Sequence, residues 1–264
     1  MGKVVGIVSL KGGVGKTSSV VALGAALSNL GKSVLLIDGN LSAPNLGLHL
    51  DLIEPEKTLH HVLNDEVPIS DAIYESNGFD VIPSSVFNSG EVSPLKLKSK
   101  LRSLKDKYDI ILIDSSPSLD SETLAVMLAS DEILVVTTPD YSTLSMTLKA
   151  SNLAKKRGTP ITGLILNKVY NKNFELSLDD IEKTSSVPVM AVVPHDSNIM
   201  KSQSRFVPSV YYSPRSKGSH EYMKLAALLS GEKYRPNNVY EFFSRITPSR
   251  QEINREIFYE GLFS

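Results

Sequence analysis

A run of glycine, lysine and threonine near the start of the chain has the residue types and spacing of a phosphate-binding loop. Gly12, Gly13 and Gly15 allow a tight turn whose backbone N–H groups face phosphate oxygens, which a Cβ at these positions would obstruct. Lys16 supplies a positive charge for the β- and γ-phosphates, and Thr17 supplies a hydroxyl for magnesium. The sequence therefore predicts a site for a nucleoside triphosphate and Mg²⁺.

The loop also departs from the general P-loop pattern. That pattern has glycine where this chain has Leu10, and a second lysine, Lys11, follows directly. This variant is typical of a narrower group of P-loop proteins. The candidate nucleotide-binding residues of the loop and of the helix that starts there are Gly12, Gly13, Val14, Gly15, Lys16, Thr17 and Ser18.

The strand, loop and helix that this motif requires follow one another in the sequence. An apolar run over 3–9 precedes the loop, and a helical pattern over 20–27 follows it, with Gly31 placed as the helix stop. The next apolar run, over 34–37, ends in Asp38. Motif and context together favour a P-loop over an ordinary turn that merely joins a strand to a helix.

Apolar runs alternate with helical patterns through most of the remaining chain. Consecutive apolar residues suit strands that are covered on both faces, and strand alternating with helix predicts a doubly wound, mostly parallel α/β sheet flanked by helices. We expect further strands at 79–83, 110–113, 133–137, 161–166 and 187–193, and helices near 93–107, 121–130, 142–157, 176–185 and 219–230.

Composition limits the classes of protein that the chain can belong to. With 264 residues, 41% of them hydrophobic, it can form one large core, so we expect a single P-loop domain over 1–231 and a short helical tail over 232–264. Because there is no cysteine, disulfides, thiolate metal sites and cysteine nucleophiles are excluded. A formal net charge of −1 provides no global attraction to nucleic acid.

No secretory signal and no apolar stretch approaching the roughly 20 residues that cross a bilayer is visible in the sequence. The expected location is therefore the cytoplasm, with the protein soluble or peripheral to a membrane.

Carboxylates end two of the expected strands. Asp114 follows the strand at 110–113, and Asp38 follows the strand at 34–37. In a parallel sheet, ligands lie beyond the carboxyl ends of the strands. A strand-ending aspartate is by itself more often a turn residue, but a P-loop needs a carboxylate near its magnesium, which often binds through water. The candidate metal residues are therefore Thr17, Asp38 and Asp114.

Several short segments together carry a resemblance to a known family. They are the loop at 11–17, 36–38 with 45–46, 113–117, 129–132 through 138–140, and 166–168. Over about residues 1–230 the chain resembles the MinD/ParA family of deviant Walker A ATPases, and it is most similar to the archaeal MinD-like members. The resemblance supports the doubly wound P-loop fold.

The resemblance implies a homodimer that forms around ATP, with ATP or ADP and Mg²⁺ as cofactors. In similar proteins the lysine that matches Lys11 reaches across the two-fold interface to the partner's phosphates, which couples nucleotide state to association. Asn167, followed by Lys168, matches the position whose amide reads adenine, although an asparagine that ends a strand is otherwise an ordinary turn residue. The loop that closes over the base in relatives would comprise Pro194, His195 and Asp196.

One position departs from the family pattern at the site of chemistry. Similar proteins carry aspartate two residues after Asp38, where this chain has Asn40. An amide can orient the attacking water but cannot accept its proton. Because phosphoryl transfer depends mainly on positioning and electrostatics, we expect slow, partner-stimulated ATP hydrolysis, while a neutral substitution is an equal alternative. The candidate catalytic residues are Lys11, Lys16, Asp38 and Asn40.

Two further segments are candidate contact surfaces. The segment 118–122 occupies the place of a second nucleotide-sensing switch, where the resemblance implies a regulatory or cargo protein. The tail carries two amphipathic faces, formed by Val239, Phe242, Phe243 and Ile246, and by Ile253, Ile257, Phe258 and Leu262. The last segment lacks the lysine-rich face that attracts acidic lipids, so docking on the protein's own domain or on a partner is favoured over the membrane surface.

Three functions remain open at this point. The first is a MinD-like ATPase that acts as a spatial-positioning or cell-division switch. The second is a ParA-like chromosome or plasmid partitioning ATPase, which the near-neutral charge disfavours. The third is a nucleotide-dependent scaffold with little hydrolysis. Iron–sulfur relatives that share the loop are excluded, because the chain has no cysteine ligand for a cluster.

Overall fold

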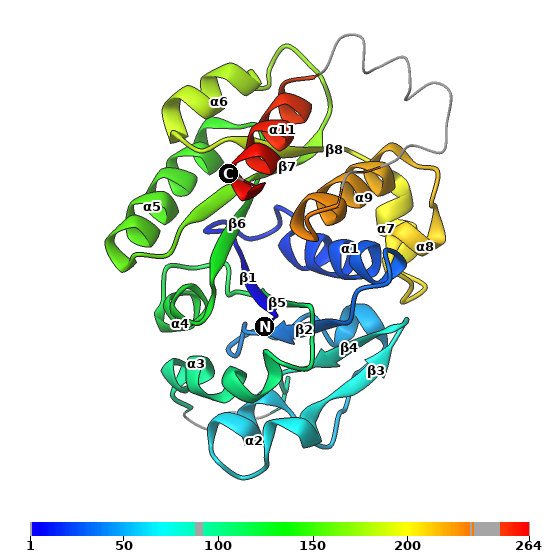
Figure 1. The fold of residues 1–264 in the computed structure, drawn as a ribbon. Helices are drawn as coiled ribbons and strands as arrows, with labels where there is room; N and C mark the ends of the chain where they lie inside the picture. Colours follow the sequence, from blue (N-terminus) through cyan, green and yellow to red (C-terminus); the bar gives the residue numbers. More distant parts are fainter. Residues whose placement is uncertain (1, 88–91, 233, 235–248, 264) are drawn as a thin grey trace.

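The computed structural model describes residues 2–87, 92–232, 234 and 249–263, and an eight-stranded sheet forms its centre (Figure 1). The strand order is β3-β4-β2-β5-β1-β6-β7-β8. Only β3 pairs in the antiparallel direction, with β4, so the expected doubly wound, mostly parallel sheet is confirmed. The strands are β1 (Lys3–Val8), β2 (Val34–Asp38), β3 (Tyr74–Ser76), β4 (Phe79–Ile82), β5 (Ile110–Asp114), β6 (Glu132–Thr137), β7 (Ile161–Val169) and β8 (Val189–Pro194).

Helices cover both faces of this sheet because successive strand side chains point to opposite sides. In β1, Val5 and Ile7 face one hydrophobic layer, whereas Val4 and Val8 face the other. The first layer is covered by α1 (Lys16–Asn29), α8 (Ser209–Tyr212), α9 (Lys217–Leu229) and α11 (Arg250–Phe263), with α7 (Ser197–Gln203) beside α8. The second is covered by α2 (Leu59–Leu63), α3 (Leu97–Lys100), α4 (Ser121–Ala129), α5 (Tyr141–Arg157) and α6 (Leu178–Ser185).

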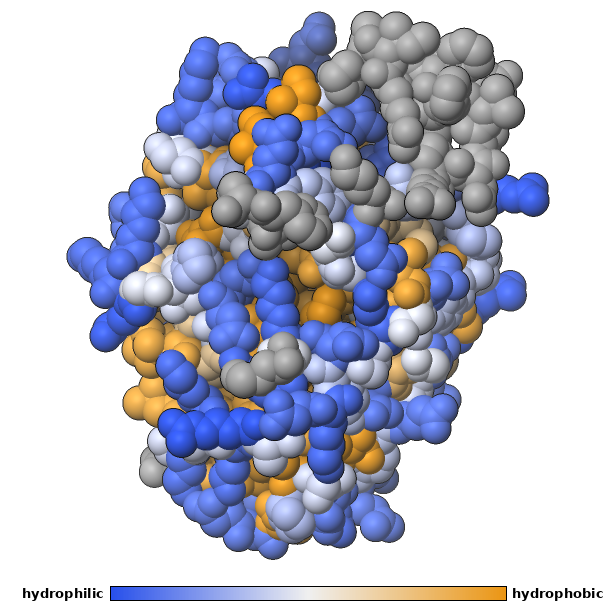
Figure 2. Space-filling view, in the orientation of Figure 1, coloured by the Kyte–Doolittle hydropathy of each residue, from blue (hydrophilic) through white to orange (hydrophobic). Residues whose placement is uncertain are grey.

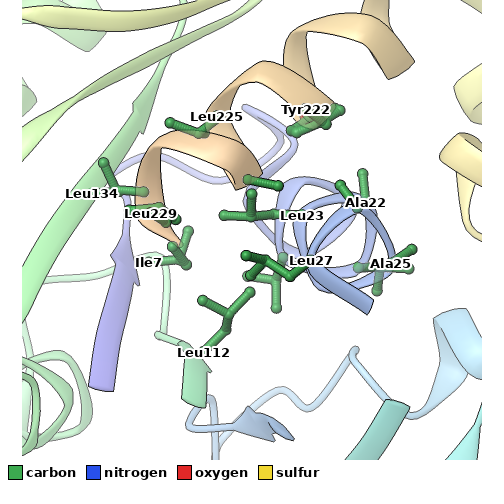
Figure 3. Packing of buried hydrophobic residues seen from close by; sticks show 14 of the residues in the cluster. Ile7, Ala22, Leu23, Ala25, Leu27, Leu112, Leu134, Tyr222, Leu225 and Leu229 are labelled. Carbon is green, nitrogen blue, oxygen red and sulfur yellow. The ribbon is translucent and has the colours of Figure 1, made fainter. Parts of the chain in front are cut away.

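The packing of α1 fixes the position of the glycine-rich loop. Leu23 and Leu27 of α1 are fully buried, and they lie between Leu225 and Leu229 of α9 and Leu112 of β5 (Figure 3). Burial of a leucine side chain contributes about 1.5–3 kcal/mol, so this contact holds the helix firmly on the sheet. The start of α1, where the loop ends, is therefore a rigid platform.

The expected helix near 93–107 is not continuous. The segment predicted as a helix near 93–107 is broken into the 3₁₀ turn Pro94–Lys96, α3, and a second 3₁₀ turn, Leu101–Leu104. Leu97, Leu101 and Leu104 are buried and attach the segment to the second hydrophobic layer, while its lysines face outward. Side-chain burial, more than a continuous ladder of backbone hydrogen bonds, therefore holds this segment in place.

The end of the tail packs on the protein's own sheet edge. Helix α11 lies against β8, and the Arg255 guanidinium donates to the Glu221 carboxylate at 2.7 Å and to the Met190 carbonyl at 2.7 Å. The expected apolar face is only partly turned inward, since Phe258 packs against the first hydrophobic layer whereas Ile253 is 42% and Ile257 is 62% exposed. Polar and aromatic side chains form the inward face, and Asn254 and Arg255 donate hydrogen bonds to the carbonyl groups of the edge strand β8.

The first expected apolar face of the tail, Val239, Phe242, Phe243 and Ile246, lies outside the described residues. Within the described segments, no helix has both the length and the apolar character needed to cross a membrane. On the face drawn in Figure 2, hydrophilic side chains cover most of the surface and hydrophobic groups are scattered among them.

Replacement of Arg255 by alanine is expected to lower the free energy of unfolding by about 3 kcal/mol, because the mostly buried Glu221 carboxylate loses its 2.7 Å ion pair and keeps the longer one to Lys224 at 3.4 Å. Lys183→Ala on α6 is the control. Its ion pair with Asp179 is exposed on both sides, so this variant should leave the free energy of unfolding nearly unchanged. Urea denaturation measures both, and equal losses would contradict the proposed anchoring of α11 through Arg255.

Candidate functional site

The glycine-rich loop joins β1 to α1 and can accept only glycine at one of its positions. Gly15 has φ +91°, and a Cβ built on it would lie 2.2 Å from the Asn167 side-chain nitrogen. A side chain here would therefore be strained and would displace Asn167. Helix α1 begins directly after this turn with no side-chain cap, so the N–H groups of its first turn are available to an anion.

Lys16 and Thr17, the first two residues of α1, both contact the end of β5. The Lys16 amine donates hydrogen bonds to the Asp114 carboxylate and to the Ser115 carbonyl. The Thr17 hydroxyl donates to the other oxygen of Asp114 at 2.6 Å. Lys16 is only 6% exposed and Asp114 is fully buried, so the charge of each compensates that of the other.

Asp38 lies beside this pair as the sheet register requires, since it is opposite Asp114 on the neighbouring strand. Its carboxylate accepts from the backbone N–H groups of Asn40, Asn45 and Leu46 at 3.0–3.2 Å. Burial, followed by the charge of Asp114, raises the pKa of Asp38 to about 7. The site thus contains two buried carboxylates, and the Lys16 side chain separates Asp114 from the cavity.

The donor set suits Mg²⁺. The Thr17 hydroxyl and the Asp114 carboxylate lie within 2.6 Å of each other, with Asp38 adjacent, and magnesium prefers such oxygen ligands while keeping several waters. Among the residues that the structure describes, no group of three or more His, Cys, Asp and Glu side chains forms a metal cage. A small number of protein oxygens completed by phosphate and water is the arrangement usual for magnesium at nucleotides.

Asn167 and Lys168 reach the loop because β7 is irregular at its end. The pairing of β7 with β8 shifts between Leu166 and Val169, and Lys168 has φ +56°. As a result, both side chains point to the loop: the Asn167 amide donates to the Val14 carbonyl at 2.8 Å, and the Lys168 amine donates to the Gly13 carbonyl at 2.6 Å. The sequence placed the end of this strand at 166, before the irregularity.

A cavity of about 520 Å³ lies above the loop. It is lined by the loop, by Asn167 and Lys168, and by the expected base-side residues Pro194, His195 and Asp196. The His195 ring is stacked on Tyr170 with centroids 4.5 Å apart, and Asp196 caps α7 by accepting from the Asn198 N–H. Asp38 and Asp114 are fully buried and do not line the cavity, and Lys16 and Thr17, which do, contact Asp114.

Several lining residues were not found from the sequence. Three of them, Ser9, Asn45 and Pro117, lie in segments singled out above but were not assigned to the site, and the others come from α7, α9 and a short 3₁₀ turn that carry no motif. The full set is Ser9, Asn45, His49, Pro117, Ile199, Met200, Gln203 and Tyr222.

Asn40 lines the cavity from the loop that follows β2. The side chain is only 3% exposed, and its amide nitrogen donates to the Ala43 carbonyl. Its amide oxygen is buried and has no hydrogen-bond partner among the described residues. An unpaired buried acceptor costs free energy, so Asn40 is a strained point of the site in the nucleotide-free protein.

Lys11 lies at the rim of the cavity. Its amine contacts the Asp140 carboxylate at 3.3 Å and the Thr143 hydroxyl at 3.1 Å, at the start of α5. Although burial raises the pKa of Asp140, hydrogen bonds from Thr138, Thr143 and Lys11 together lower it to about 2. The Lys11 side chain remains 41% exposed, unlike Lys16.

Comparisons with known proteins agree on the family. An AAA domain model matches residues 2–157. An ATP-binding protein of Methanocaldococcus jannaschii is 36% identical over 87% of this chain and 88% of its own length. The cell division ATPase MinD of Pyrococcus furiosus is 38% identical with a TM-score of 0.81, and the alignment covers 86% of this chain and 97% of that one. MinD of Pyrococcus horikoshii, solved with Mg-ADP, is 36% identical with a TM-score of 0.81, over 86% and 95% of the two chains. The chain belongs to the MinD/ParA family of P-loop ATPases.

Proposed function

We propose that this protein binds ATP with Mg²⁺, hydrolyses it slowly, and acts as a MinD-like switch in spatial positioning or cell division. The arrangement of Lys16, Thr17 and Asp114 at the base of a glycine-lined cavity carries this proposal. Lys16 would turn from Asp114 to the β- and γ-phosphates, and Thr17, with Asp38 and Asp114, would hold Mg²⁺. The bound ion neutralises charge on the phosphates during phosphoryl transfer.

The base would occupy the other part of the same cavity. Asn167 would recognise adenine through its amide, while Lys168 holds the loop in place through the Gly13 carbonyl. Pro194, His195 and Asp196 would close over the base, supported by their position in the cavity lining. This assigns a phosphate end and a base end to one continuous site.

ATP would also join two subunits. Lys11 lies at the exposed rim of the cavity, from which its amine can reach the phosphates of a second copy once it leaves Asp140. We favour this switch over a DNA-partitioning ATPase because the net charge of −1 gives no attraction to DNA. We further propose that 1–231 is the ATPase domain and 232–264 a tail, with a regulatory or cargo protein as partner.

Replacing Asn40 with aspartate is expected to accelerate single-turnover ATP hydrolysis by about tenfold or more, because a carboxylate can accept the proton of the attacking water. Asn152→Asp, which adds the same charge at an exposed position on α5 away from the cavity, is the control and should have little effect. Rapid-quench measurements of ADP formation compare the three proteins. Equal rates for the native protein and Asn40→Asp would mean that this position does not limit the chemistry, and no hydrolysis in any of them would contradict the ATPase proposal.

A further inference from the structure

Two buried carboxylates hold the loop over residues 39–46, which carries Asn40. One is Asp38 at the end of β2, described above. The other is Glu122, which comes from the first turn of α4 on a different part of the chain. Its carboxylate accepts from the Leu41 N–H at 2.9 Å, from the Ser42 N–H at 3.0 Å and from the Ser42 hydroxyl. The loop is therefore fixed from both sides.

The geometry at Glu122 is that of a bound anion. Consecutive backbone N–H groups that converge on one carboxylate form an anion-binding nest, and such charge-assisted hydrogen bonds are about twice as strong as neutral ones. Glu122 is only 8% exposed, and the hydrogen bonds that the described residues give its carboxylate all come from this loop. An exposed glutamate on a helix could be hydrated by water, whereas the buried Glu122 carboxylate depends on these hydrogen bonds. The contact therefore fixes the position of the loop.

Asn40 stands between these two anchored points. Its own N–H is bound by Asp38, and the next two residues, Leu41 and Ser42, are bound by Glu122. Asn40 lines the nucleotide cavity, and its amide oxygen is buried without a hydrogen-bond partner among the described residues. Because the backbone on both sides of Asn40 is held, the direction of its side chain depends on both carboxylates.

The helix that carries Glu122 is itself connected to the phosphate end of the site. Asp120 caps α4 by accepting from the Thr123 N–H, and it also accepts from the Ser116 hydroxyl at 2.6 Å. Ser115, the preceding residue, accepts a hydrogen bond from the Lys16 amine through its carbonyl. The chain from Ser115 to Glu122 thus joins the lysine that would bind phosphate to the loop that holds Asn40.

We propose that Glu122 is a positioning residue that ties the Asn40 loop to α4 and so sets the rate of ATP hydrolysis. This inference rests on the proposed function, because it assigns a role at the same site. Glu122 does not line the cavity, so it acts through Asn40 and not on the nucleotide. Hydrolysis then depends on where α4 lies, whereas nucleotide binding depends on the glycine-rich loop.

Glu122→Gln tests this assignment with little change in side-chain volume. The amide presents N–H donors where the nest also presents N–H donors, so one hydrogen bond becomes a repulsive contact. We expect single-turnover ATP hydrolysis to fall by about tenfold, while the dissociation constant for ATP changes by less than about threefold, as for the loss of an interaction used mainly in the transition state. Glu75→Gln, an exposed glutamate on β3, is the matched control.

A double-mutant cycle with Asn40→Ala separates positioning from a general structural effect. If Glu122 acts through Asn40, Glu122→Gln should reduce hydrolysis in the native background but have no further effect in the Asn40→Ala background. Equal reductions in both backgrounds, or a rate for Glu122→Gln equal to that of the native protein, would overturn the inference. Should Glu122→Gln fail to fold, Ser42→Ala, which removes only one donor to Glu122, takes its place in the same cycle. Absence of hydrolysis in the native protein would instead contradict the proposed function itself.

Discussion

Replacing Lys16 with alanine is expected to lower the affinity for ATP by about a hundredfold. The amine would make charge-assisted hydrogen bonds to the β- and γ-phosphates, each contributing roughly 1.5–3 kcal/mol, and about 1.4 kcal/mol corresponds to a factor of ten. The same change affects the nucleotide-free protein, because the Asp114 carboxylate is fully buried and loses its partner. Removing one member of such a pair costs about 3 kcal/mol or more in the free energy of unfolding.

Isothermal titration calorimetry with ATP and Mg²⁺, and urea denaturation without them, measure the two effects separately. Lys98→Ala, an exposed lysine on α3, is the control and should change neither quantity. If Lys16→Ala bound ATP as tightly as the native protein, the glycine-rich loop would not be the phosphate site, and the assignment of the cavity would be wrong.

The stability of the nucleotide-free protein is expected to fall as the pH rises from 4 to 7, through an unfavourable contribution from Asp38. Burial and the neighbouring Asp114 raise the pKa of Asp38 from 3.8 to about 7 in the folded protein. Between these pH values the folded protein retains a proton that the unfolded chain releases. The cost of ionising the buried carboxylate is therefore absent below pH 4 and fully developed above pH 7. The loss is up to about 4 kcal/mol in total.

Asp38→Asn should remove this pH dependence. It should also lower the free energy of unfolding by the same amount at every pH, because the amide offers one acceptor fewer to the backbone N–H groups. Urea denaturation in EDTA at a series of pH values, for the native protein and the variant, measures the difference in slope. Asp51→Asn, at an exposed carboxylate on the surface, should leave the slope as it is. Parallel curves for native protein and Asp38→Asn would show that the buried carboxylate titrates normally.

The parts of the molecule that follow from local chemistry could be predicted from the sequence. The glycine-rich loop, the strands on either side of it and the carboxylates at strand ends carry patterns that a phosphate site and a parallel sheet impose on the chain. The structure accordingly brings Lys16, Thr17, Asp38 and Asp114 together at the carboxyl edge of the sheet. Because parallel strands end at the same edge of the sheet, the residues that follow them must lie close together there.

The features that depend on tertiary contacts could not be predicted in the same way. Glu122 and the loop it binds are about 80 residues apart in the sequence. The sequence placed Glu122 in the candidate switch segment 118–122, but no pattern connected it with Leu41 and Ser42. Asn167 reaches the loop only because β7 shifts its register at its end. On α11, the apolar stripe did not predict that Ile253 and Ile257 are exposed, because Arg255 fixes the helix through Glu221 and a carbonyl at the sheet edge.

The proposed switch is tested most directly by the molar mass of the protein in different nucleotide states. Size-exclusion chromatography with light scattering is run with Mg²⁺ and either ADP or ATP, on the native protein and on Lys11→Ala, after calorimetry has established that Lys11→Ala still binds ATP. We expect the native protein to be a monomer with ADP and a dimer with ATP, and Lys11→Ala to be a monomer with both. A native protein that never dimerises with ATP, or a Lys11→Ala variant that dimerises equally well, would contradict the account.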